Sequence, residues 1–260
     1  MRSPAVAVFD VYLDLAASGR VMAHVLEPPG LGVRFASRAE MNRHLPHEIA
    51  QHLTWLAHHE EPVPADAVPV FRIAEEASMR GDFESGDDVG FYGPDEVPVT
   101  PPEIERHLRI AAYAHGDLLA LVAPLDEPAL DWVRDECTRP IRRVLRHVVG
   151  AELWYMDRII DDPDRVPLPD IIAEADRRCD ATEDQVERLR IIWPAFQQWA
   201  RSLTADQRGR VTAPTWWTRR PGERWSARKM LRRCIEHSRE HTRSIERILA
   251  DFTAARRGGP

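Results

Sequence analysis

The chain has 260 residues, of which 43% are hydrophobic and 30% are charged, with a net charge of −7. This composition is that of an ordinary globular protein rather than a disordered one, and the length allows one large domain or two modest ones. No run approaches the roughly 20 apolar residues of a membrane span, and Asp10 and Asp14 interrupt the partly apolar start, so the sequence predicts neither a membrane protein nor a secretory signal.

Cysteine usage and charge distribution narrow the class further. The three cysteines, Cys137, Cys179 and Cys234, are widely spaced and do not predict a disulfide framework, so a cytoplasmic location is expected. Residues 1–98 contain 7 Arg and no Lys against 16 Asp and Glu. Because nucleic-acid binding depends on neutralising phosphates, this acidic part argues against a nucleic-acid partner.

Residues 1–78 predict a small α+β module with the order β-β-β-α-β. Its four expected strands are 5–14, 20–27, 33–36 and 68–74. The first strand is typical of a half-buried one, with Phe9, Val11 and Leu13 on one face and polar residues on the other. Ser37-Arg-Ala-Glu40 is a capping-box pattern that begins the expected helix, and Pro46 should kink or split that helix.

Two stretches of this module carry a resemblance. The expected strand pair Ser18–Gly32, with Pro28-Pro-Gly-Leu-Gly32 at its end, and the Ser37–Glu40 helix start are similar to the HicB-like antitoxin fold. The resemblance implies a partner-binding module, although the toxin-blocking or DNA-binding tail of that family has no counterpart here. The alternative is a small packing or dimerising module whose strand edges pair in a homodimer.

Residues 79–99 are acidic and rich in Gly, Asp and Pro, which predicts a linker or an exposed loop. From residue 100 to 255 the pattern is helical. Apolar residues at helical spacing predict four long helices, at 100–122, 140–160, 180–203 and 226–249. Their lengths predict a four-helix bundle. The loop before the last helix carries Trp216 and Trp217, which either wall a pocket or anchor the loop.

The last expected helix carries His237 and His241 in the middle of its apolar side. Four residues correspond to about 400° of rotation, so the two imidazoles project together. His147 lies beside the apolar stripe of the second expected helix. Three His donors plus one or two waters form an open site for a divalent transition metal. From spacing alone, ordinary buried or surface histidines remain the alternative.

The order of these elements resembles the DinB/YfiT-like superfamily over about residues 100–252. The likeness is carried by residues 140–154, which surround His147, and by residues 225–241, which end in His237-Ser-Arg-Glu-His241. In that family a four-helix bundle carries a three-His divalent metal site, often zinc or nickel. The resemblance therefore implies that His147, His237 and His241 are the metal ligands.

The resemblance also implies a metal-dependent enzyme. Characterised relatives include thiol S-transferases and isomerases that use a low-molecular-weight thiol such as mycothiol or bacillithiol. Metal binding would lower the pKa of such a thiol, and the thiolate would attack a small electrophilic substrate. Two alternatives stay open. One is a metal-water-dependent hydrolase. The other is a non-catalytic binding or regulatory protein with a structural metal and a partner-binding HicB-like module.

Three further residues could belong to the site. Glu240 could contact a ligand or pair with Arg233 or Arg243, Cys234 could be a thiol ligand or a core residue, and His115 could approach from the first long helix. The remaining histidines have no converging partner in the sequence and are expected on the surface or in packing contacts: His24, His44, His47, His52, His58, His59 and His107.

Overall fold

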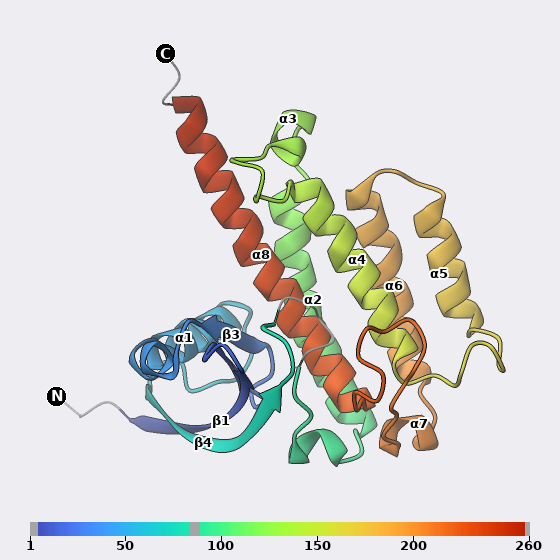
Figure 1. Cartoon of the computed structure of the whole chain (residues 1–260), viewed down its shortest axis with the longest axis horizontal. Helices are drawn as coiled ribbons and strands as arrows, with labels where there is room; N and C mark the ends of the chain where they lie inside the picture. Colours follow the sequence, from blue (N-terminus) through green and yellow to red (C-terminus); the bar gives the residue numbers. More distant parts are fainter. Residues whose placement is uncertain (1–4, 84–88, 258–260) are drawn as a thin grey trace.

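The computed structural model describes residues 5–83 and 89–257, which form a small sheet beside a group of long helices (Figure 1). The elements in chain order are β1 Val6–Ala16, β2 Val21–Val25, β3 Leu31–Phe35, α1 Arg38–His58, β4 Val68–Met79, η1 Gly93–Glu96, α2 Pro101–Val122, α3 Glu127–Asp131, α4 Ile141–Asp157, α5 Asp170–Asp180, α6 Gln185–Ser202, α7 Ala205–Gly209 and α8 Ala227–Arg257. No helix in the described ranges is long and apolar enough to cross a membrane.

The four strands form one mixed sheet in the order β3-β2-β1-β4. Strand β1 is antiparallel to β2 and parallel to β4, and α1 lies between β3 and β4 in the chain. Alternation along β1 places Phe9, Val11 and Leu13 in one core with the apolar residues of α1. The α+β class predicted for this part, with its order β-β-β-α-β, is confirmed.

The structure corrects part of two local predictions for this module. Strand β1 is half-buried only in its first half, where Val6 and Val8 are exposed, because residues 11–14 are all buried. Tyr92 packs on Tyr12, with ring centroids 5.1 Å apart, and so covers the second face of the strand. Helix α1 continues through Pro46 without a break. Its apolar residues before and after the proline, Leu45 and Ile49, are buried against the same sheet, which holds both halves in one helix.

The second part of the chain is helical, as predicted. Helix α8 packs against α2 and α4, and α6 packs against the same two helices from the other side, so that the four longest helices of this part form a closed ring. Their shared core is apolar. Helix α6 begins at Gln185, and a separate helix, α5, precedes it. The sequence prediction misses α5 because its buried stripe is only Ile172, Ala175 and Cys179.

Helix α8 lies between the sheet and the other helices, and contacts β3 and η1 as well as α2 and α4 (Figure 1). Its first turn is capped by Ser226, since the Lys229 backbone N–H donates to Ser226 Oγ at 3.2 Å. It continues to Arg257, beyond the predicted end. Every residue from 229 to 239 is buried. A helix that is buried all round has neighbours on both faces, and here the charged residues face the sheet.

The segment predicted as a linker or exposed loop contributes to this interface. Residues 84–88 of it lie outside the described residues. In the described part Phe83, Val89, Tyr92 and Asp95 are buried. Asp95 accepts hydrogen bonds from Nε and Nη2 of Arg232 on α8, at 2.9 and 2.7 Å. The described part is therefore buried at these four positions and exposed at residues 96–98, and it connects the sheet to α8.

Candidate metal centre

The structure brings the three predicted histidines together. His237 and His241 lie one turn apart on α8, and His147 projects from α4 toward them. Nε2 of His237 lies 3.1 Å from Nε2 of His147 and 3.0 Å from Nε2 of His241. One potential ligand atom from each ring lies within 4.8 Å of the others. The local helical spacing sets the α8 pair, and the packing of α4 on α8 supplies the third ring.

All three imidazoles are held neutral. Burial lowers the pKa of His237 well below its usual value, and the charges that His241 and His147 would carry lower it further. Burial and the neighbouring His147 lower the pKa of His241 to about 3. Burial and the charge of Arg139 lower the pKa of His147. Neutral imidazole is the form that can donate a lone pair to a metal.

The ring nitrogens of the group are better placed to bind a metal than to form hydrogen bonds with one another. A neutral imidazole carries one N–H, and the Nδ1 atoms of His237 and His241 are buried without a hydrogen-bond partner in the described part of the chain. If their protons are on Nδ1, two Nε2 lone pairs face each other across 3.0 Å. A cation between the rings would accept those lone pairs. Neighbouring nitrogens of a tetrahedral zinc site are about 3.3 Å apart, close to the observed spacing.

The group is open on one side. His237 is 3% exposed, His241 is half-buried and His147 is exposed to solvent. Within residues 5–83 and 89–257, no fourth His, Cys, Asp or Glu joins the three rings. Cys234 lies in the apolar core. His115 stacks on Trp193 and makes its ring hydrogen bond to the Leu189 carbonyl at 3.2 Å. Neither Cys234 nor His115 therefore belongs to the group.

Helix α4 adds two buried polar residues that the sequence analysis overlooks. The Tyr155 ring meets His237 edge-on, with centroids 5.7 Å apart, and burial raises its pKa to about 12. Burial also raises the pKa of Glu152 to about 8, and neither of its carboxyl oxygens has a partner among the described residues. Both are therefore protonated at neutral pH. Their spacing from Val148, four and seven residues, is the available sequence signal that they face the core.

The sheet also reaches this region. Glu240, the residue before His241, forms an ion pair with Arg34 of β3, with Nη2 and Oε1 2.9 Å apart. The sequence analysis proposes Arg233 or Arg243 as its partner, because both lie near it on the same helix. Arg233 instead pairs with Glu236 and Arg243 with Glu48 of α1. Tertiary contacts thus replace the local pairs.

The tryptophan loop before α8 is anchored to the end of α4. The Trp217 carbonyl accepts a hydrogen bond from Trp154 Nε1 at 2.6 Å, and the Trp216 carbonyl accepts one from Arg158 at 3.1 Å. The Trp217 side chain is 54% exposed. Of the two predicted roles, these contacts favour the loop anchor.

Another buried histidine, from the sheet, packs against the opposite face of α8. His24 of β2 lies between Asp14 Oδ2, 3.0 Å from Nε2, and Glu236 Oε2, 3.1 Å from Nδ1. Burial lowers its pKa, but the two carboxylates outweigh burial and the net shift is upward. The expectation that His24 has no converging partner is wrong. Its partner on α8 is 212 residues away in the sequence, beyond the reach of local pattern.

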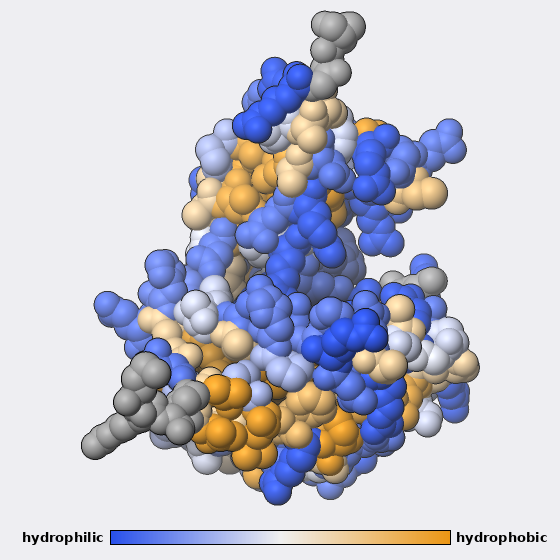
Figure 2. All heavy atoms as spheres, turned by 90° about the vertical axis from the view of Figure 1, so that its left-hand side faces the viewer, coloured by the Kyte–Doolittle hydropathy of each residue, from blue (hydrophilic) through white to orange (hydrophobic). Residues whose placement is uncertain are grey.

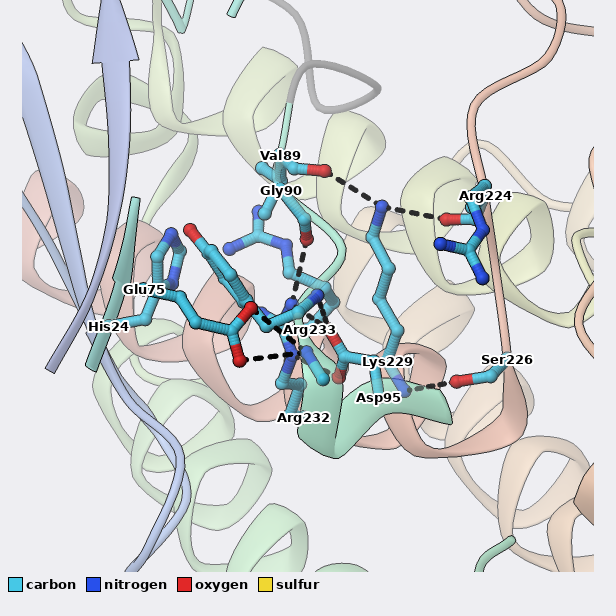
Figure 3. Close-up of polar contacts among 12 residues, drawn as sticks. His24, Glu75, Val89, Gly90, Asp95, Arg224, Ser226, Lys229, Arg232 and Arg233 are labelled. Carbon is cyan, nitrogen blue, oxygen red and sulfur yellow. Dashed lines mark hydrogen bonds and ion pairs between the residues drawn. The ribbon is translucent and has the colours of Figure 1, made fainter. Parts of the chain in front are cut away.

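Other charged residues surround this histidine (Figure 3). Arg233 Nη1 lies 2.7 Å from Glu236 Oε2. Farther along the helix, Lys229 Nζ donates to the Val89 carbonyl at 2.8 Å and pairs with Glu223 at 2.7 Å. The face of α8 toward the sheet is thus buried and ionic, whereas its face toward the helices is apolar apart from His237 and His241.

The sequence was compared with known proteins. A family model described as the DinB superfamily matches residues 112–245, which is just over half of the chain and includes all three histidines of the group. No curated protein and no solved structure matches significantly.

Proposed function

We propose that this chain, which belongs to the DinB superfamily, holds a divalent transition metal on Nε2 of His147, His237 and His241. The observation that carries the proposal is the convergence of three neutral imidazoles, with Nε2 atoms 3.0 and 3.1 Å apart. Zinc and nickel suit an all-imidazole set. DinB-like proteins commonly bind divalent metals, and the four long helices would then form the bundle of that superfamily.

The proposed activity is that of a metal-dependent enzyme in which a low-molecular-weight thiol reacts with a small electrophile. A metal on this site supplies a positive charge that lowers the pKa of a bound thiol or water. Three neutral histidines leave that charge uncompensated, which favours an anionic ligand. The exposed side of His147 leaves access for such a ligand, while Tyr155 presents a phenol that keeps its proton at neutral pH.

Metal content tests the first step. Purified protein should hold about one divalent ion per chain, measured by elemental analysis. His237→Ala and His147→Ala should each lose most of it, because two remaining donors bind far more weakly than three. The matched control is His44→Ala, which removes an exposed histidine of α1 and should leave metal content unchanged. Full retention of the metal by both ligand variants would contradict the proposal.

Activity assays distinguish thiol transfer from the hydrolase alternative. Metal-loaded protein should accelerate conjugation of a small thiol with an aromatic or unsaturated electrophile, and His237→Ala should abolish the acceleration. Hydrolysis of an activated ester without added thiol, lost in the same variant, would instead support a metal-activated water. Metal binding without either activity would favour the non-catalytic alternative with a structural metal.

One observation favours a binding role for the N-terminal module beside this activity. Val6, Val8, Val68 and Val70, which are paired across β1 and β4, are each at least 40% exposed. Figure 2 shows hydrophobic side chains gathered near the N-terminal end of the chain. A partner of the HicB-like module, or a second copy of the chain, would cover them. If a homodimer forms through this patch, Val70→Asp should convert it to a monomer in light-scattering measurements.

A further inference from the structure

The sheet and α8 are aligned so that β3 reaches the metal centre. Residues 32 and 34 of β3 are two apart, about 6.7 Å along a strand, and residues 236 and 240 of α8 are four apart, about 6 Å along a helix. A Cβ added at Gly32 would lie 3.2 Å from Glu236 Oε2, and Arg34 pairs with Glu240 at 2.9 Å. Because these two spacings are nearly equal, the Arg34 guanidinium lies beside Glu240, the residue that precedes His241.

Arg34 has donors left over at this position. Its side chain is 36% exposed, and the Glu240 contact occupies one of its nitrogens. A guanidinium offers five N–H donors in a planar fork that matches a carboxylate or phosphate. Glu240 neutralises part of the charge. Glu240 directly precedes His241, so the ion pair holds the guanidinium beside the turn of α8 that carries His237 and His241.

Arg139 adds a second cation on the α4 side. It is exposed and lies two residues before the start of α4, the helix that carries His147. Together with a divalent ion on three uncharged ligands, the two guanidiniums make the opening electropositive. Charge of this sign, on donors with fork geometry, selects an oxyanion rather than a neutral group.

We infer that Arg34 forms an anion-binding subsite of the metal centre, so that the ligand or substrate carries a carboxylate or a similar oxyanion next to the atom that reaches the metal. The inference rests on the proposed metal centre and deepens it by naming a ligand class. Arg34 lies outside residues 112–245, the part of the chain that matches the DinB superfamily. The N-terminal module would therefore complete a site whose metal ligands all come from the helical part.

A pair of matched thiols tests the subsite. Full-length protein loaded with Co²⁺ would be titrated with 3-mercaptopropionate and with 3-mercaptopropionamide, which differ in charge but hardly in size. Thiolate-to-cobalt charge-transfer absorption reports binding without requiring turnover. Wild type should bind the carboxylate at least about tenfold more tightly, as one charge-assisted hydrogen-bond pair predicts. Arg34→Gln should remove this preference and leave the cobalt content unchanged.

Two further variants keep the test decisive. Arg34→Lys retains the charge but not the planar fork of donors and should keep part of the preference. This variant still tests the subsite if Arg34→Gln folds poorly. Arg38→Gln removes an arginine of the same module that pairs with Glu76, and should behave as wild type. Equal affinity of wild type for the two thiols, or an unchanged preference in Arg34→Gln, would overturn the subsite. Absence of bound cobalt, or of an absorption band with either thiol, would instead refute the proposed thiol-binding metal centre.

Discussion

The two faces of α8 bury the same residue types in opposite charge states. Toward the other helices, His237 lies against His147, His241 and the Tyr155 ring, and burial keeps it neutral. Toward the sheet, His24 lies between two carboxylates, and its pKa is raised. The glutamates follow the same division. Burial raises the pKa of Glu152 on the helical side, whereas His24 and Arg232 outweigh burial and lower the pKa of Glu236 on the sheet side.

The difference shows that burial alone does not decide the protonation state of these groups. Desolvation disfavours every charge, and it wins where no opposite charge is in contact. A neutral histidine can bind a metal, and a charged one cannot. The bundle face of α8 is therefore suited to ligand chemistry. The sheet face is suited to joining the two parts of the chain by ion pairs.

The largest expected effect on stability comes from removing His24. His24→Ala would leave the buried carboxylates of Asp14 and Glu236 facing each other without the cation between them, and should destabilise the fold by about 3–5 kcal/mol. In metal-free protein His237→Ala should cost clearly less, because a neutral ring leaves no unpaired charge behind. Urea unfolding of both variants at neutral pH compares the two values. A larger loss for His237→Ala would invalidate the comparison.

The same histidine gives a pH signature. Its folded pKa lies above the unfolded value of 6.5, so its contribution to stability is complete below that pH and is lost as pH rises through the folded pKa. Wild type should therefore lose this contribution on the alkaline side, and His24→Ala should not. Denaturant midpoints measured across that range would reveal the difference.

Glu152→Gln should have the next largest effect, and at neutral pH it should stabilise the fold, whereas His24→Ala destabilises it. The folded pKa of Glu152 is about 8 and its ordinary value is 4.5, so the native state retains a proton that the unfolded state releases between these values. Stability should fall on the order of 3 kcal/mol between about pH 5 and about pH 8, and the amide variant should remove that fall. Glu246→Gln, an exposed change on α8, is the control. An unchanged pH profile in Glu152→Gln would mean that this carboxyl has a partner when folded.

The smallest expected effect concerns the start of the helix that carries both faces. Ser226 Oγ accepts the Lys229 backbone N–H, and Ser226→Ala should cost about 1 kcal/mol of stability. Ser226 touches neither the three histidines nor the His24 cluster. Metal affinity and that cluster should therefore be unaffected at temperatures where the protein is folded. Calorimetry with and without bound metal would measure both quantities. A selective loss of metal affinity would show that the start of α8 is coupled to the turn that carries His237 and His241.

Local patterns along the sequence determine much of this protein. Alternation in residues 5–14 predicts β1, the Ser37–Glu40 capping box predicts the start of α1, and the four-residue spacing predicts that His237 and His241 project together. The apolar spacing from residue 100 onward predicts the helical part, and residues 140–154 and 225–241 resemble the DinB superfamily. These features depend on contacts a few residues apart, which periodicity records directly.

Only the tertiary structure decided the charge states and the partners of the buried groups. Arg34 meets Glu240, and His24 meets Glu236, across 206 and 212 residues of sequence. The same packing covers the second face of β1 at Tyr12 and buries Val89, Tyr92 and Asp95 of the segment predicted as a linker. Electrostatic energy depends on distance and on the exclusion of water, and both are set when the sheet and the helices close on α8. A residue's type gives its ordinary pKa, and the fold around it determines whether that residue carries a charge.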